Sequence, residues 1–252
     1  MNTDKIKELI ANTGGQIGLL LKNLKTGEVI MAHNEGMVFP SASTIKLPIL
    51  LCLLDEALEG KLDLNEEAAV SPIDMVEGSG LLRHMSASLQ SWRDHALLMI
   101  TVSDNASTNH LISRLGMDKI NAKIRSIPMH DTVLGRKMMD FEARSRGMDN
   151  FTSCLDMLAL FDHFFKNTGK YGEALNILKQ QQHNGLLAGL LDSDSFEFAH
   201  KTGGLKRIRH DIGIMYLRDP IFTAFMSKET EETRALNLAH KIGLEVYENF
   251  RP

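Results

Sequence analysis

Apolar residues are continuous over residues 47–54, directly after a segment, residues 41–46, that mixes polar and apolar side chains. A helix that begins near Ser43 would carry apolar side chains on every face, a pattern typical of a helix buried in the middle of a domain. The run is too short to span a bilayer, which needs about 20 apolar residues. We therefore predict a buried central helix, and its polar residues Ser43 and Lys46 need a separate explanation.

Strand patterns occur in two groups that lie far apart in the sequence. An N-terminal helix is expected near residues 3–13, followed by a hairpin of apolar runs at 16–22 and 28–33. Three more strands are expected at 196–202, 212–217 and 221–226, before a final helix that begins near Thr230. We expect the five strands to pair into one antiparallel sheet.

The pattern between Ser43 and about Gln182 is helical. Ser91 with Asp94, and Ser153 with Asp156, each form the sequence of a capping box in front of an apolar run. We found no internal repeat, low-complexity tract or linker, so the fold class is expected to be α+β in one interlocked unit.

Composition narrows the choice of partners and compartment. The 252 residues carry a net charge of −4 with basic residues scattered, which argues against nucleic acid or an anionic membrane as partner. The first ten residues lack the basic start and apolar run of a signal peptide. A cytoplasmic location is expected for a full chain, and a periplasmic or extracellular one if a signal has been removed. Cys52 and Cys154 are interpreted as packing residues.

Three short polar motifs carry the candidate chemistry. Ser43 and Lys46 are three residues apart, so one helical turn can place an amine beside a hydroxyl. The alternative is a helix cap followed by a solvent-exposed lysine. A second motif, Ser103-Asp104-Asn105, also suits an ordinary connector between helices. A third, Lys201-Thr202-Gly203, equally suits the end of a strand.

All three motifs occur in this order, with Ser103 following Ser43 by 60 residues and Lys201 following Ser103 by 98. Through this set the chain resembles the class A serine β-lactamases, over essentially its whole length. The resemblance implies an α/β half from residues 1–40 and 193–252, an all-helical half from residues 41–192, and an active site at their interface. Residues 78–82 then form a loop beside the pocket, and residues 136–152 an Ω-shaped loop under it.

The resemblance also assigns roles. Ser43 would attack a carbonyl and form an acyl-enzyme, with Lys46 as its base and the charge of Lys201 keeping the pKa of that base low. Ser103 would relay a proton to the leaving nitrogen. The backbone amides of Ser43 and Gly204 would bind the oxyanion. The substrate-binding residues are then Asn105, Lys201, Thr202, Gly204 and Arg209.

No metal or cofactor enters this scheme, and the ten histidines show no metal-ligand spacing. The expected partner is a small β-lactam or acyl-D-amino-acid substrate, and the chain is expected to be a monomer without a membrane span. One departure limits the prediction. Class A enzymes usually carry a deacylating glutamate two residues after an Ω-loop arginine, and if that arginine is Arg136 the matching residue is Met138.

Glu142 is the candidate base if the loop follows a different path, and its alternative is a surface residue paired with Arg144 or Arg146. The first expectation is therefore a β-lactamase that hydrolyses the ring through acyl-Ser43. Two others stay open. One is a peptidase or esterase for D-Ala-D-Ala-like substrates, and the other is a sensor-like module that acylates once and deacylates slowly.

Overall fold

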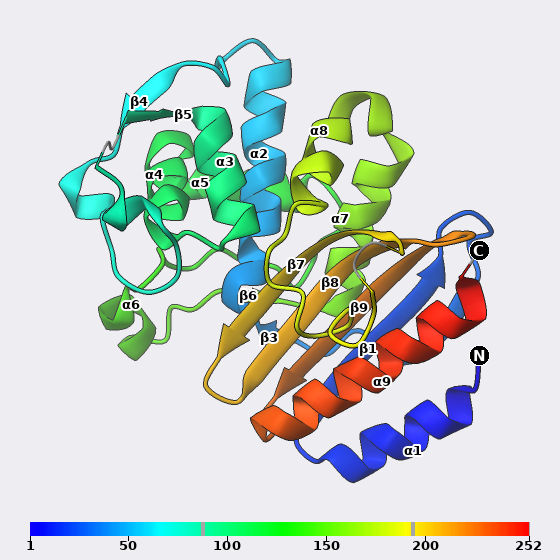
Figure 1. The fold of residues 1–252 in the computed structure, drawn as a ribbon. Helices are drawn as coiled ribbons and strands as arrows, with labels where there is room; N and C mark the ends of the chain where they lie inside the picture. Colours follow the sequence, from blue (N-terminus) through cyan, green and yellow to red (C-terminus); the bar gives the residue numbers. More distant parts are fainter. Residues whose placement is uncertain (87–88, 193–194, 252) are drawn as a thin grey trace.

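The computed structural model of the chain describes residues 1–86, 89–192 and 195–251 (Figure 1). Its sheet has five antiparallel strands in the order β2-β1-β9-β8-β7. The prediction of one antiparallel sheet from two distant groups is confirmed. The predicted boundary at residue 193 lies outside the described residues. The strands are β1 (Gln16–Asn23), β2 (Val29–His33), β7 (Glu197–Leu205), β8 (Ile208–Tyr216) and β9 (Pro220–Lys228).

Two helices, α1 (Thr3–Thr13) and α9 (Glu232–Phe250), cover one face of the sheet (Figure 1). Their apolar stripes pack on alternate residues of the strands, as the period of two in a strand requires. In α9 the stripe contains the residues that helical spacing predicted, Ala235, Leu238, Ala239, Ile242 and Val246. The side chain of Asn2 caps the start of α1 by accepting from the Lys5 amide.

The helical half surrounds α2 (Lys46–Leu58), in which every residue from Lys46 to Glu56 is buried. The predicted central helix is confirmed, but its first turn is tighter than expected. Ser43 lies in a separate 3-10 turn, η1 (Ala42–Ile45), which leads directly into α2. The other helices are α3 (Trp92–Thr101), α4 (Asn105–Leu115), α5 (Met117–Arg125), α6 (Phe141–Ser145), α7 (Cys154–Lys166) and α8 (Thr168–Leu178).

Short elements that the apolar pattern did not predict connect these helices. Two 3-10 turns, η2 (Pro72–Asp74) and η3 (Leu82–His84), lie between the strands β4 (Glu67–Ala69) and β5 (Leu89–Ser91), which pair with each other. A second pair joins β3 (Phe39–Pro40) to β6 (Phe151–Thr152). Strands of two or three residues carry too little periodicity to be recognised in sequence.

The two predicted helix caps differ in detail. Ser91 and Asp94 form the full capping box at the start of α3. Ser153 accepts from the Asp156 amide, but the Asp156 carboxylate turns away. It accepts from the amides of His130 and Asp131 and from the Thr132 hydroxyl. Asp156 therefore ties a distant loop to α7.

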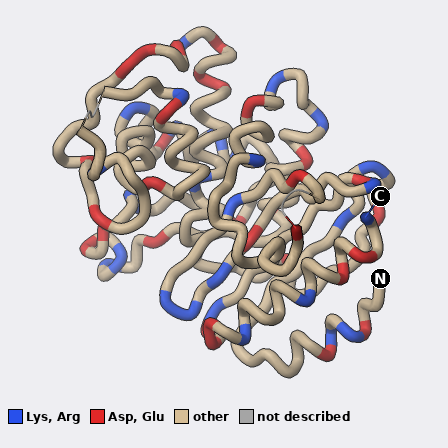
Figure 2. Tube along the Cα trace, in the orientation of Figure 1, with Lys and Arg blue, Asp and Glu red and all other residues tan. Residues whose placement is uncertain are grey.

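One apolar core joins the helical half to the second face of the sheet. Cys52 and Cys154 are free and buried, as predicted. Acidic and basic residues are interspersed along the chain in both halves (Figure 2). Within the described ranges, no helix is both long and apolar enough to cross a membrane.

Candidate active site

Ser43 lies where the helical half meets the edge strand β7. The residue before it, Ala42, has a φ of 47°, so the backbone turns sharply just ahead of the hydroxyl. Gly203 of β7 packs against this turn. A Cβ atom on Gly203 would lie 3.2 Å from the Ser43 amide nitrogen and from the Ser41 carbonyl. Glycine at this position therefore lets the strand approach the nucleophile closely.

Lys46 is fully buried directly behind Ser43, because α2 is covered on every side. Its ammonium group donates to the Ser103 carbonyl (2.7 Å), the Ser103 hydroxyl (3.1 Å) and Asn105 Oδ1 (3.0 Å). Burial, and then the charge of Lys201, hold the pKa of Lys46 well below its usual value. A lower pKa favours the neutral amine, which is the form of lysine that can accept a proton.

The Ser103-Asp104-Asn105 motif connects α3 to α4, as its alternative interpretation also predicted, and it has a further role. Ser103 has a φ of 57°, a left-handed conformation that costs about 1 kcal/mol or more for a residue other than glycine. Lys46 donates to both the carbonyl and the hydroxyl of Ser103 and so holds this conformation. Asp104 caps α4 by accepting from the Ser107 amide.

Lys201 lies inside β7 and is fully buried, so the predicted strand end at this motif is wrong. Its ammonium group donates to the Thr202 carbonyl at 2.9 Å. Desolvation lowers the pKa of Lys201 to about 7, against the opposing charge of Asp211. The strand continues through Gly204, which pairs with Arg209 of β8.

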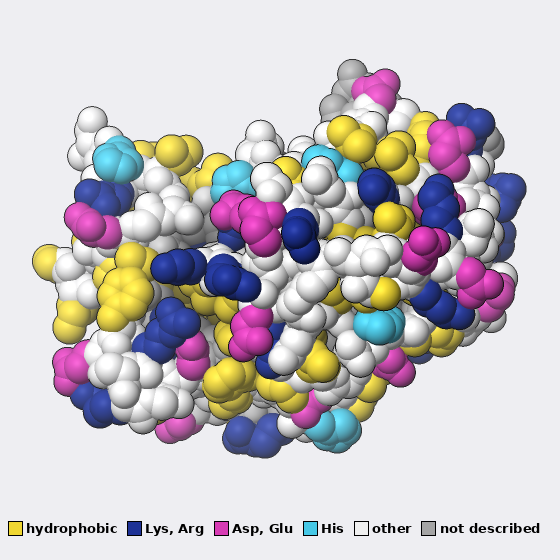
Figure 3. Space-filling view, turned by 90° about the horizontal axis from the view of Figure 1, so that it is seen from below, with side chains coloured by type: hydrophobic (Ala, Val, Ile, Leu, Met, Phe, Trp, Pro, Cys, Tyr) yellow, Lys and Arg dark blue, Asp and Glu magenta, His cyan; other side chains and the backbone are white. Residues whose placement is uncertain are grey.

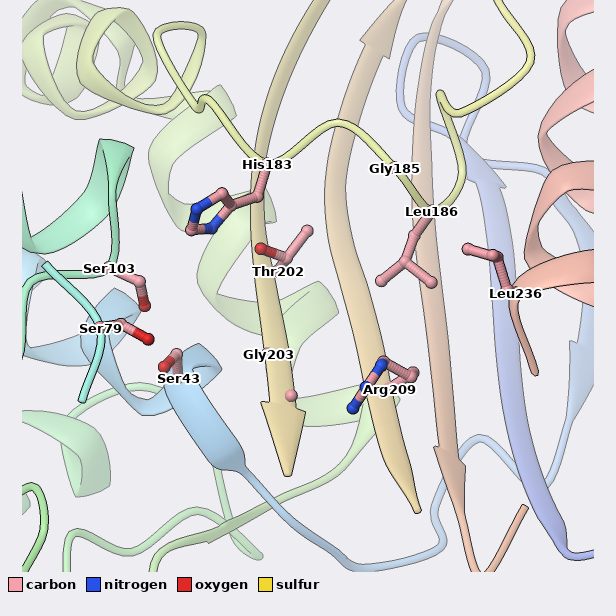
Figure 4. Close-up of a pocket in the computed structure, with 11 residues that line it drawn as sticks. Ser43, Ser79, Ser103, His183, Gly185, Leu186, Thr202, Gly203, Arg209 and Leu236 are labelled. Carbon is pink, nitrogen blue, oxygen red and sulfur yellow. The ribbon is translucent and has the colours of Figure 1, made fainter. Parts of the chain in front are cut away.

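Two cavities meet at Ser43. The larger, of about 330 Å³, contains the side chains of Ser43, Ser103 and Thr202, which all face the same space (Figure 4). The smaller, of about 160 Å³, lies on the other side of Ser43. Six predicted site residues therefore line the space around one hydroxyl, namely Ser43, Ser103, Asn105, Thr202, Gly204 and Arg209. Lys46 and Lys201 are buried behind them.

The smaller cavity is lined by the loop of residues 136–152. Arg136 and Asp149 form a nearly buried ion pair of 2.8 Å across this loop, which fixes its path. Met138, Met139 and Phe141 face the cavity, and Met138 is only 7% exposed. Figure 3 shows hydrophobic side chains at the end of the molecule where α6 lies, with basic side chains beside them.

The structure does not bring Glu142 to Ser43. Its side chain is 82% exposed on α6 and forms an ion pair with Arg146. The loop follows the path that places Met138, and not Glu142, against the cavity. Physically, the Arg136–Asp149 pair anchors the loop and leaves Glu142 on the outer surface of the short helix. The alternative interpretation of Glu142, a surface ion pair, describes its position.

Arg209 lines the larger cavity, but most of its donors are engaged. Nη1 donates to the carbonyls of Leu205 and Ile208, each at 2.8 Å, and Nη2 pairs with Glu232. Asn105 is similarly engaged, because its Nδ2 donates to the Glu77 carbonyl at 3.2 Å.

The sequence predicted a loop beside the pocket at residues 78–82, but it singled out neither Ser79 of this loop nor His183. Ser79 enters both cavities because the Asp104 carboxylate accepts from the amides of Leu81 and Leu82, at 2.6 and 2.8 Å, and so holds this loop. His183 reaches the larger cavity from the segment before β7. No spacing rule marks a single histidine in a polar segment, so only the fold identifies it.

The chain matches the model of a family described as the beta-lactamase enzyme family over residues 2–250. Among curated proteins it is 24% identical to the beta-lactamase PSE-4 of Pseudomonas aeruginosa over 179 residues, which are 70% of this chain and 60% of that protein. The chain thus matches less than two thirds of the length of this relative.

Solved structures agree with the fold. A beta-lactamase from Sphaerobacter thermophilus superimposes with a TM-score of 0.88, at 23% identity, over 99% of this chain and 98% of that one. A mutant of PBP-A, solved as an acyl-enzyme complex with penicillin G, gives 0.87 at 26% identity, over 98% of this chain and 94% of that one. The fold is that of the class A β-lactamases.

Proposed function

The chain belongs to the beta-lactamase enzyme family, and from this premise we propose that it is a serine hydrolase that opens β-lactam rings through an acyl-Ser43 intermediate. Family and fold support a hydrolase. The observation that carries the proposal is the buried ammonium group of Lys46, which binds Ser103 and Asn105 directly behind the cavity that contains Ser43.

Acylation proceeds in one concerted series of proton transfers. The neutral amine of Lys46 takes the proton of the Ser43 hydroxyl as its oxygen attacks the lactam carbonyl. The backbone amides of Ser43 and Gly204 bind the developing oxyanion, and one such donor contributes about 3 kcal/mol. The lactam C–N bond breaks, and the Ser103 hydroxyl gives its proton to the leaving nitrogen and regains one from Lys46.

Substrate binding uses the opposite wall of the cavity. Thr202 and Arg209 line this wall and would bind the substrate carboxylate, with the buried Lys201 next to Thr202 in β7 adding positive charge. The positive charge of Lys201 also lowers the pKa of Lys46, so the same group favours both substrate binding and base formation. The acyl-enzyme of the PBP-A mutant with penicillin G supports a penicillin as the first probe.

Mass spectrometry of the intact protein with benzylpenicillin tests acylation. We expect an adduct of one drug molecule on the wild-type protein, mapped to Ser43, and none on S43A. Ser145 is an exposed serine at the end of α6 and provides the matched control, since S145A should acylate normally. Hydrolysis of a chromogenic cephalosporin that persists in S43A would refute the proposal.

A second function, slow release typical of a penicillin-binding peptidase, is favoured by Met138. In the small cavity beside Ser43 this position holds a thioether, which cannot activate a water molecule. Under this function the adduct persists, and a D-Ala-D-Ala ester or peptide is cleaved faster than a β-lactam. Steady turnover of the cephalosporin, with a transient adduct, would instead favour the β-lactamase.

A further inference from the structure

His183 is an exposed titratable side chain in the larger cavity that has no part in the acylation steps. It lies in the segment between α8 and β7, and its ring points toward Ser103 above the Thr202 hydroxyl (Figure 4). In the described lining of this cavity, His183 and Arg209 are the two side chains that carry nitrogen donors. They lie on opposite sides of Thr202.

The donors near the expected substrate carboxylate are unequally available. Arg209 already donates to Leu205 and Ile208 and pairs with Glu232. Lys201 is buried and donates to a backbone carbonyl. The imidazole of His183 is exposed to the cavity, where a ligand can reach it.

We propose that His183 is a substrate-binding residue whose imidazole donates a hydrogen bond to the carboxylate of the substrate, beside Thr202. The inference rests on the proposed function, because it names the group that recognises the anionic end of the substrate in the same cavity. The substrate class is therefore an acyl compound with a carboxylate on the leaving-group side. Hydrogen bonds to a charged partner are the strong ones in proteins.

The electrostatic surroundings of His183 favour this role. The groups that act on it are Lys201 and His200 on β7 and Lys46 on α2, and Arg209 lies across the cavity on β8. Two acids face these groups, because Asp211 of β8 pairs with His200 and Glu232 of α9 pairs with Arg209. Desolvation first, and then the charges of Lys201, Lys46 and His200, lower the pKa of His183 in the free protein. A bound carboxylate opposes these charges and raises this pKa. Binding should therefore take up a proton, and affinity should rise as pH falls.

The experiment measures binding without chemistry, in the S43A background. Calorimetric titration with benzylpenicillin and with its methyl ester, at pH 6.0 and 7.5, separates the carboxylate from the rest of the ligand. We expect H183F, which keeps a ring but has no donor, to bind benzylpenicillin about tenfold more weakly, as loss of a hydrogen bond to a charged group implies. The methyl ester should bind equally to both proteins.

H183Q keeps a neutral hydrogen-bond donor but cannot take up a proton, so it separates the effect of the imidazole charge from that of the hydrogen bond. Its affinity for benzylpenicillin should rise less between pH 7.5 and 6.0 than that of the protein with His183. The pH dependence that remains in H183Q belongs to the two lysines of the site, Lys201, whose pKa is about 7, and Lys46, whose pKa is lowered. H130Q, which changes an exposed histidine outside the lining of both cavities, should show unchanged affinities.

Equal loss of affinity for the acid and the ester, or no loss for either, would overturn the inference. So would the absence of measurable benzylpenicillin binding by S43A. Failure of the proposed function gives a different result, since the wild-type protein would then form no adduct on Ser43. Carboxylate-dependent binding through His183 would still be measurable in that case.

Discussion

At the scale of single residues, two buried ammonium groups define the site. Lys46 and Lys201 are fully buried, although burial of a lysine normally costs several kcal/mol. Three hydrogen bonds offset part of this cost at Lys46, whereas Lys201 donates to only one carbonyl. Burial lowers the pKa values of both lysines, which favours the proposed chemistry, but the same burial lowers the stability of the folded protein.

We predict that K201M stabilises the protein by about 1–3 kcal/mol at pH 6, because it removes a buried charge. The pKa of Lys201 is about 7 in the folded protein and near its ordinary value when unfolded. As pH falls from about 10.5 to 7, the unfolded state takes up the proton of Lys201 before the folded state does. The free energy of unfolding of the wild-type protein therefore falls across this window, and the loss stays constant below it. The advantage of K201M should therefore be largest at pH 6 and nearly vanish at pH 10.

Urea unfolding at both pH values measures this difference, and the same samples should show that K201M is acylated far more slowly. An advantage of equal size at pH 6 and pH 10 would contradict the explanation from burial of charge.

Substitutions at Met138 and at Glu142 should affect deacylation differently. M138E places a carboxylate in the cavity beside Ser43, and we expect it to shorten the lifetime of acyl-Ser43 about tenfold or more, as a general base does. Because Met138 is buried, the new carboxyl should have a raised pKa, and its effect should grow with pH. M138Q adds polarity without a base and serves as control.

E142Q should leave the lifetime unchanged, since this carboxylate is exposed and paired with Arg146. Time-resolved mass spectrometry of the penicillin adduct measures all three variants. A longer lifetime in E142Q would mean that the loop moves Glu142 to the site during turnover.

At the scale of elements, the site depends on how loops are attached to helix ends. Asp104 is 1% exposed, and its carboxylate accepts from the amides of Leu81, Leu82 and Ser107. One side chain thus caps α4 and holds the loop that carries Ser79. Gly80 has a φ of 122°, and a Cβ there would lie 2.2 Å from the Asp104 carboxylate, so only glycine fits this contact.

We predict that D104N lowers the free energy of unfolding by about 2 kcal/mol, because an amide nitrogen cannot accept the bonds that one carboxylate oxygen accepts. Acylation should also slow about tenfold, since Asn105 and Ser79 lie on the two segments that Asp104 joins. D118N, an exposed acid in the first turn of α5, should change stability by less than about 0.5 kcal/mol.

Denaturant unfolding and the acylation rate together check this prediction. Normal stability with slow acylation would identify Asp104 as an electrostatic contributor to Lys46 instead of a link between elements.

At the scale of the whole molecule, the core crosses the boundary between the two halves. The same apolar cluster contains residues of α2 and α7 and residues of β8 and β9. Ser43 lies on the 3-10 turn at this boundary, and Gly203 packs on that turn from the sheet. The division into residues 1–40 with 193–252 and residues 41–192 remains a prediction. We propose that these halves do not fold independently.

Unfolding should therefore be a single cooperative transition. Trp92 is the only tryptophan of the chain and is buried in the helical half, so its fluorescence reports that half alone. Far-UV circular dichroism reports both halves. We expect the two urea transitions to coincide in midpoint and slope. A tryptophan transition that precedes the circular dichroism transition would show separable halves.

Much of this fold follows from local patterns in the sequence. The apolar run over residues 47–54 can bury its side chains from water only in the interior of the protein. The spacing of the apolar residues within 235–246 gives α9 a single buried stripe. The capping box at Ser91 involves residues that are close together in the chain, so it can also be predicted from the sequence. The Ser153 box is only half formed, because the Asp156 carboxylate accepts from the amides of His130 and Asp131 in a distant loop.

The sequence by itself determined the sheet, the buried helix and the three motifs, because periodicity and short-range spacing encode them. Tertiary structure alone decided what each motif residue contacts. Burial turned Lys46 and Lys201 from ordinary lysines into groups with low pKa values, and β7 continued through Lys201 because β8 pairs with it. The Arg136–Asp149 pair placed Met138 in the cavity and Glu142 outside, and the path of the chain before β7 brought His183 to the site. These outcomes depend on contacts between residues far apart in the chain, and such contacts leave no local pattern.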